Sequence, residues 1–190
     1  NAASKQLTLD YYGTSHNGSA FYQQADESWS CSLSEGNRIT QDSIGNTIEV
    51  FDNRQYDNSW KASDFFFQES EKPVHRLLKE TKGIYTTLPT YPAYVNRLRH
   101  VLSPIAEHED SLGLHYDFGR FFQGSVRITL REAKKGERLE INGLVYICSG
   151  EMDEQAFRRL STSRQKSITI KGDRHFRKSQ IQKIEGLEIY

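Results

Sequence analysis

The dipeptide Asn142-Gly143 constrains the fold more than any other feature, because Asn-Gly favours a type I′ turn between two paired strands. Two short runs rich in apolar residues flank it, Arg138–Ile141 and Leu144–Cys148. Upstream, Ser125–Leu130 alternates apolar and polar residues, and Lys134-Lys-Gly-Glu137 supplies a turn. We therefore predict a three-stranded antiparallel meander whose register is set by the Asn-Gly turn.

The first 70 residues have the pattern of a small antiparallel β unit. Segments with strand-like alternation are separated by turn residues, for example in Gly13-Thr-Ser-His-Asn-Gly18. The predicted strands are Gln6–Tyr12, Ser28–Ser34, Arg38–Gln41, Thr47–Phe51 and Ser63–Gln68.

Three segments carry signals for helices. Pro73 suits the first turn of a helix that runs to Lys82 and stops at Gly83. Further helices are predicted over Pro92–Leu102 and Asp153–Leu160, and two short strands follow at Ser167–Ile170 and Gln180–Ile184. Strand-rich ends around a helical middle predict an α+β fold that is mainly antiparallel β.

Length and composition favour one ordered domain. The chain has 190 residues, with ten Phe, ten Tyr and two Trp to supply large buried surfaces. We expect a single domain over 1–190 with three lobes: a β unit at 1–70, a helical segment at 71–110, and a meander or small-barrel-like lobe with a basic end at 111–190. No apolar run approaches the ~20 residues of a membrane span, so no membrane insertion is expected.

The first residues of the chain and its two cysteines bear on the cellular compartment of the protein. The sequence begins Asn1-Ala2-Ala3 and its single Met is Met152, which favours a bacterial protein whose front segment has been removed. We expect the soluble part of an exported or membrane-anchored protein, periplasmic or extracellular, with a cytoplasmic location as the alternative. The two cysteines, Cys31 and Cys148, form either a disulfide or two buried free thiols.

The neutral net charge hides a basic segment. Between Gln155 and Ile184 there are nine Lys/Arg residues against one acid, Asp173. Such a segment can bind an acidic protein surface or a small polar ligand, bind nucleic acid through Phe157 and Phe176 among its cations, or neutralise acids of its own fold. The predicted anion-binding residues are Arg158, Arg159, Arg164, Lys171, Arg174, Arg177 and Lys178.

Catalytic and cofactor motifs are absent from the sequence. It has no Gly-x-Ser-x-Gly, no phosphate-binding Gly-rich loop and no His-Glu-x-x-His. No cofactor is therefore predicted. A metal-dependent enzyme is one alternative, because His115, Asp117 and His175 follow the order of a two-His, one-carboxylate site beside the acidic loop Glu107–Ser111.

Aromatic residues among Asn, Gln, Asp and Ser in the N-terminal region predict a second binding patch. Rings stack on sugars or protein surfaces while amides donate hydrogen bonds, and Trp60 and Tyr56 lie in the most polar stretch. Together these features predict a non-catalytic binding domain, with a nucleic-acid-binding module and a metal-dependent enzyme as the alternatives.

Overall fold

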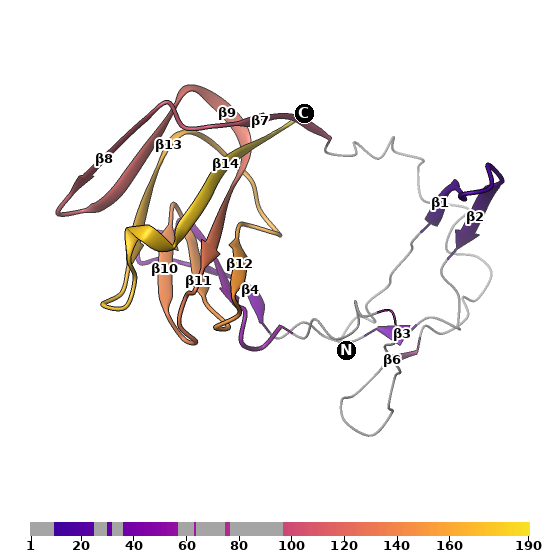
Figure 1. Cartoon of the computed structure of the whole chain (residues 1–190), viewed down its shortest axis with the longest axis horizontal. Coiled ribbons are helices and arrows are strands. Elements are labelled where there is room, and N and C mark those ends of the chain that lie inside the picture. Colours follow the sequence, from indigo (N-terminus) through magenta and orange to yellow (C-terminus); the bar gives the residue numbers. More distant parts are fainter. Residues whose placement is uncertain (1–9, 25–29, 32–35, 57–62, 64–74, 77–96) are drawn as a thin grey trace. The chain divides into compact units, whose positions relative to one another are not determined.

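The computed structural model of the chain describes residues 10–24, 30–31, 36–56, 63, 75–76 and 97–190 (Figure 1). The chain divides into two units. The first contains the described residues 10–24, 30–31 and 75–76, and the second contains 36–56, 63 and 97–190. The described residues form strands and one short 3₁₀ helix, and none of them lies in an α-helix. The predicted α+β class is therefore wrong, and the fold is β.

The first unit contains two small antiparallel pairs. Strand β1 (Asp10–Thr14) pairs with β2 (Ala20–Gln24), and β3 (Ser30–Cys31) pairs with β6 (His75–Arg76). The turn between β1 and β2 closes with Ser15 N donating to Ser19 O at 2.9 Å. Because β6 lies inside the segment 73–82, the helix predicted there is wrong at these two residues, and the others lie outside the described residues.

The second unit is built on one extensively paired sheet. Its strand order is β4-β5-β11-β10-β13-β9-β14-β7, and β8 and β12 also pair with β9. Among its described strands, all pairs are antiparallel except β5 with β11. The strands are β4 (Asn37–Gln41), β5 (Thr47–Asp52), β7 (Leu98–Leu102), β8 (Ala106–Asp110), β9 (Gly113–Arg131), β10 (Arg138–Ile141), β11 (Leu144–Ile147), β12 (Asp153–Ala156), β13 (Ser163–Gly172) and β14 (Ile181–Ile189).

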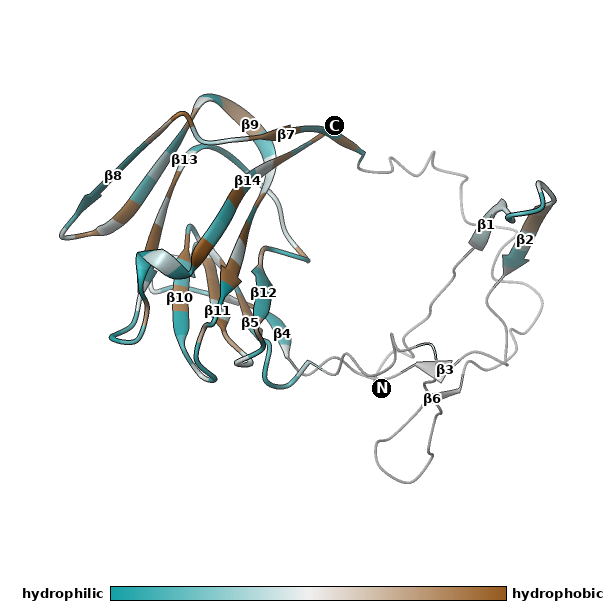
Figure 2. Ribbon diagram, in the orientation of Figure 1, coloured by the Kyte–Doolittle hydropathy of each residue, from teal (hydrophilic) through white to brown (hydrophobic). Residues whose placement is uncertain are grey.

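The long strand β9 organises this unit. Its first part, around Leu114 to Asp117, pairs with β8 and β13, whereas its second part, from Gly124 to Leu130, pairs with β14 and is flanked by β12. Alternate side chains of β9 are buried, as the period of a strand requires. They join buried residues of the other strands in one hydrophobic core, and the alternation of apolar and polar residues is visible along the strands (Figure 2).

The Asn-Gly hairpin is confirmed, but the predicted meander is wrong. Strands β10 and β11 pair around Asn142 and Gly143, which have φ of 37° and 81°. The expected third strand, Ser125–Leu130, lies in β9, and β13 is inserted between β9 and β10. Turn residues report a local hairpin, whereas the order of more distant strands depends on pairings far apart in the chain.

The other helix predictions also fail where the structure describes them. Strand β7 occupies Leu98–Leu102 within the second predicted helix, whose residues 92–96 lie outside the described residues. In place of the third helix, β12 covers Asp153–Ala156 and pairs with β9. Its alternate residues Glu154 and Ala156 are buried, so tertiary packing overrides the helix propensity of this stretch. The strand predicted at 63–68 lies outside the described residues except Ser63, which is in a turn.

Cys148 is fully buried within the hydrophobic core of the second unit, and burial raises the pKa of its thiol. Cys31 lies in β3 of the first unit, and the bridge between the two stays a prediction. Among the described residues, no helix has the length and apolar character needed to cross a bilayer.

The carboxylate of Glu188 on β14 interacts with side chains of both neighbouring strands, β9 and β7. Both oxygens of Glu188 accept hydrogen bonds from Arg120, at 2.7 and 2.6 Å, and Nδ1 of His100 lies 2.7 Å from Oε2. Arg120 and then His100 lower the pKa of Glu188 to about 2. The carboxylate is therefore ionised throughout the range in which the protein is normally handled.

Glu188→Gln should lower the melting temperature at neutral pH but not in strong acid. The folded-state pKa lies below the ordinary value of 4.5, so the ionised carboxylate stabilises the fold above that value and loses this effect as the pH falls toward about 2. Thermal denaturation at several pH values from about 7 to 2 checks this. A difference from wild type that stays constant with pH would contradict it. Glu140→Gln, at an exposed pair with Arg138, is the control and should change little.

Candidate binding groove

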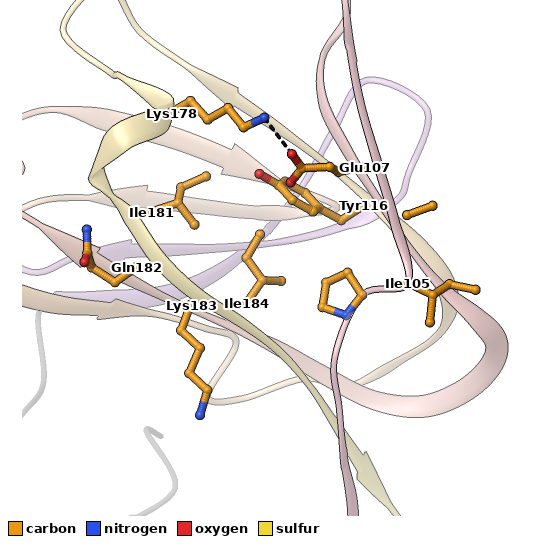
Figure 3. Close-up of a pocket in the computed structure, with 10 residues that line it drawn as sticks. Ile105, Glu107, Tyr116, Lys178, Ile181, Gln182, Lys183 and Ile184 are labelled. Carbon is orange, nitrogen blue, oxygen red and sulfur yellow. Dashed lines mark hydrogen bonds and ion pairs between the residues drawn. The ribbon is translucent and has the colours of Figure 1, made fainter.

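A groove of about 440 Å³ lies where β8, β9 and β14 meet (Figure 3). Ligand sites in proteins usually have volumes of about 300–1,000 Å³, so this one has room for a small molecule. Its lining residues come from the segment before β8, from β8 and β9, and from the 3₁₀ helix η2 (Lys178–Gln180) with the start of β14. They are Pro104, Ile105, Ala106, Glu107, Tyr116, Lys178, Ile181, Gln182, Lys183 and Ile184.

The floor of the groove is apolar. Tyr116 and Ile184 are almost fully buried, and Ile181 is partly buried against the same core. Tyr116 faces inward because it alternates along β9 with Leu114 and Phe118, which are also buried. The groove is therefore an opening over the hydrophobic core, bounded by strand edges.

The hydroxyl group of Tyr116 makes no hydrogen bond within the described residues, although the ring is buried. Its end of the ring lies toward Glu107 and Lys178 (Figure 3). Burial, and then the nearby Glu107 carboxylate, raise the pKa of Tyr116, so the hydroxyl stays protonated. A neutral hydroxyl group in this place can both donate and accept a hydrogen bond to a ligand.

Charged side chains form the rim. Lys178 Nζ donates to Glu107 Oε1 at 2.8 Å, and this hydrogen bond raises the pKa of Lys178. Glu107 is placed there by the β8–β9 register, which sets it opposite Tyr116. At the other side, Lys183 Nζ lies 2.6 Å from Glu185 Oε1. The rim thus presents ammonium and carboxylate groups beside an apolar floor.

The predicted anion-binding residues are distributed over the second unit. Lys178 lines the groove, whereas Arg158 donates to the carbonyl oxygen of Asn142 and Arg164 lies over the ring of Phe121 at 4.8 Å. Arg177 donates to the carbonyl oxygen of Arg174 at 3.0 Å, and Lys171 and Arg174 are exposed.

Part of the basic segment forms ion pairs with acidic side chains of the second unit. Lys166, Lys178 and Lys183 form ion pairs with Asp117, Glu107 and Glu185, respectively. These pairs correspond to the third role considered for the segment, neutralisation of acids in its own fold. Binding of nucleic acid stays a prediction.

One residue of the predicted anion-binding set, Arg159, contacts Tyr56 of the predicted aromatic patch. The guanidinium of Arg159 lies 4.7 Å from the centre of the Tyr56 ring and 4.0 Å from that of Phe51. The backbone N–H of Arg159 also donates to buried Glu49, at 2.7 Å. Arg159 therefore covers the aromatic edge of the core, while Trp60 lies outside the described residues.

The predicted metal residues do not gather as the sequence order indicated. Asp117 accepts a hydrogen bond from Gly119 N and faces Lys166 at 3.7 Å, and the backbone N–H of His175 donates to Asp173. Among the described residues, the structure brings together a different group, His108, Asp110 and His115.

The sequence did not identify most of the groove. Glu107 belonged to a predicted acidic loop, but the structure places it in β8, and its partner Lys178 is 71 positions away. Tyr116 and Ile184 carried no sign of a site beyond strand alternation. A cross-strand relation of this kind needs the register between β8, β9 and β14, which no local pattern supplies.

The fold of this chain also occurs within known enzyme structures. Neither a protein-family model nor a curated protein matches the chain. The structure of α-L-rhamnosidase from Dictyoglumus thermophilum matches 96% of the chain with a TM-score of 0.60 and 21% identity. That of Streptomyces avermitilis α-L-rhamnosidase complexed with L-rhamnose matches 94%, with a TM-score of 0.57 and 15% identity. The chain shares its fold with part of each enzyme. It spans 22% and 18% of their respective chains, about a fifth of their length.

Proposed function

We propose that the second unit is a non-catalytic carbohydrate-binding domain and that the groove at Tyr116 holds the sugar. The observation that carries this proposal is the hydroxyl group of Tyr116, which has no hydrogen-bond partner among the described residues and lies between an apolar floor and the Glu107–Lys178 ion pair. A sugar presents the complementary surface, with apolar C–H faces and hydroxyl groups at its edges. The hydroxyls can donate to Glu107 and accept from Lys178.

The chemistry of the floor favours a sugar with an apolar edge. Ile181 and Ile184 of the floor, with Pro104 elsewhere in the lining, offer methyl and methylene groups, which suit the methyl group of a 6-deoxy sugar. L-rhamnose is such a sugar, and it is the compound in complex with the Streptomyces avermitilis enzyme, of which one part has a fold similar to this chain. We therefore take L-rhamnose as the first ligand to test.

The lining of the groove supports binding over hydrolysis. Glycoside hydrolases commonly use two carboxyl groups about 5–9.5 Å apart, one on each side of the bond to be cleaved. Among the described lining residues, Glu107 supplies one carboxylate, which is paired with Lys178. A groove with this lining can orient a sugar without a second carboxyl group to complete the chemistry.

Tyr116→Phe should weaken sugar binding by up to about tenfold without lowering stability, since it removes a hydroxyl group that has no protein partner among the described residues. Titration calorimetry with L-rhamnose measures the change, and thermal denaturation checks the fold. Tyr190→Phe, outside the groove, is the matched control.

Lys178→Ala should also weaken binding of L-rhamnose by up to about tenfold, measured in the same way. Lys171→Ala, at an exposed lysine outside the lining, should leave binding unchanged.

A matched pair of sugars tests the apolar floor. L-mannose differs from L-rhamnose by a hydroxyl group at C6, so a methyl-binding floor should favour L-rhamnose by roughly tenfold. Equal affinity for both would reject the assignment of the floor. Absence of saturable binding to either sugar, or binding unchanged by both Tyr116→Phe and Lys178→Ala, would overturn the proposed function.

A further inference from the structure

We propose that His108, Asp110 and His115 bind a divalent transition-metal ion at the end of the β8–β9 hairpin. These side chains are separate from the lining of the sugar groove. The inference therefore does not depend on the proposed function.

The strand register brings the three side chains together. His108 on β8 lies directly opposite His115 on β9, and Asp110 lies at the last pair before the turn, opposite Gly113. The two imidazole rings are stacked with centroids 4.4 Å apart and an interplanar angle of 8°. One ligand atom from each of the three residues lies within 4.8 Å of the others.

Small movements would turn this arrangement into a coordination site. Two nitrogen or oxygen ligands at about 2.0–2.2 Å from a tetrahedral zinc ion lie roughly 3.4 Å apart. His115 Nε2 and Asp110 Oδ1 are already 2.8 Å apart, so they need to separate by tenths of an ångström. His108 is exposed and can turn from its stacked position toward the same point.

Two further hydrogen bonds hold the ligands in place. His115 Nδ1 lies 3.1 Å from the hydroxyl of Thr169, its cross-strand neighbour on β13. When Nδ1 carries the proton and donates a hydrogen bond to the Thr169 hydroxyl oxygen, the lone pair of Nε2 is free for a metal. A hydrogen bond of this kind commonly orients a metal-binding histidine. Asp110 Oδ1 also accepts from Leu112 N at 2.7 Å, which orients the carboxylate.

The ligand types select the metal class. Two imidazoles and a carboxylate suit Zn²⁺, Ni²⁺ or Cu²⁺, whereas Ca²⁺ and Mg²⁺ prefer six or more oxygen ligands. Three protein ligands leave one tetrahedral position for water or another small ligand. The competing explanation is an Asp110–His115 hydrogen bond that only closes the hairpin, and it predicts no metal affinity.

The test is titration of the full chain, without a histidine tag, with Zn²⁺ in competition with a chromogenic chelator. We expect one Zn²⁺ per chain and no competition from Ca²⁺. His108→Ala and Asp110→Asn each remove or weaken a direct metal ligand and should each weaken Zn²⁺ binding by at least about 100-fold, more than the roughly 10–100-fold that loss of a residue supporting a ligand commonly causes. Asp110→Asn keeps an oxygen for Leu112 N, and His108 is exposed, so both variants should fold, as circular dichroism will show.

Matched controls separate this site from general histidine binding. His175→Ala and Asp117→Asn remove an imidazole and a carboxylate outside the cluster and should leave the affinity unchanged. Thr169→Val, which removes the hydroxyl beside His115 Nδ1, should weaken binding by about tenfold. The proposal is overturned by the absence of stoichiometric Zn²⁺ binding, by equal binding of Ca²⁺, or by affinity that survives both His108→Ala and Asp110→Asn.

Discussion

Glu154→Ala should lower the free energy of unfolding by about 3–5 kcal/mol, one of the two largest effects expected from a single substitution in this protein. The carboxylate is buried on β12 and accepts four hydrogen bonds. Its donors are Asn53 Nδ2 at 2.8 Å, Tyr146 Oη at 3.0 Å, and the backbone N–H groups of Ser149 and Gly150 at 2.9 and 2.8 Å. Alanine leaves these donors without their acceptor.

Two further variants show whether the hydrogen bonds cause the loss. Glu154 Oε2 accepts three of the bonds and Oε1 accepts the fourth, from Gly150. In Glu154→Gln the amide oxygen can take the position of Oε2 and keep its three hydrogen bonds. The NH₂ group then faces the N–H of Gly150, so the substitution should cost about 1–2 kcal/mol. Glu151→Ala, at an exposed neighbour, should change stability by no more than about 0.5 kcal/mol. Urea denaturation measures all three. A loss below about 1 kcal/mol for Glu154→Ala would contradict the argument.

Gly124→Ala should destabilise the fold by more than about 3 kcal/mol, because a methyl group has no space there. Gly124 lies at the point where β9 changes partners, paired with Ser163 of β13 on one side and Glu188 of β14 on the other. A Cβ atom at this position would overlap the backbone carbonyl oxygen of Leu187. Backbone cannot turn aside as a side chain can, so β9 and β14 would have to separate.

Gly45→Ala is the control for Gly124→Ala, measured by the same urea denaturation. Gly45 has a φ of +86° in a turn, and a Cβ atom there would meet nothing within 4 Å. The cost should be only that of the left-handed backbone conformation, about 1 kcal/mol. Equal losses for the two variants would show that backbone conformation, rather than overlap with β14, limits Gly124.

The buried carboxylates show why the helix prediction over Asp153–Leu160 fails. The stretch has good helix formers, and a sequence pattern assigns acidic residues to the surface. Glu154 is instead an inward-facing strand residue whose partner Asn53 is 101 positions away. Glu49 is equally buried, and it accepts a hydrogen bond from Arg159, 110 positions away. Because these partners come from other strands, no local period could reveal that the acids are internal.

The candidate sites were visible in the sequence only as residue types. Lys178 was predicted to meet a negatively charged group, and the structure places it beside Glu107 and Tyr116. The alternative of a metal-dependent enzyme grouped His115 with Asp117 and His175, whereas the register of β8 and β9 sets His115 opposite His108. The chemistry of each residue follows from its side chain, but its neighbours follow from strand pairing.

The sequence alone determined some local elements of this protein. The hairpin at Asn142-Gly143 and the strands at 38–41 and 47–51 follow from turn residues and from alternation, which act over a few positions. Only the tertiary structure decided that β13 separates β9 from β10, that β12 is a strand, and that β8, β9 and β14 enclose a groove. The physical reason is that these outcomes depend on burial and on backbone hydrogen bonds between segments far apart in the chain, and local patterns carry no information about which distant segments meet.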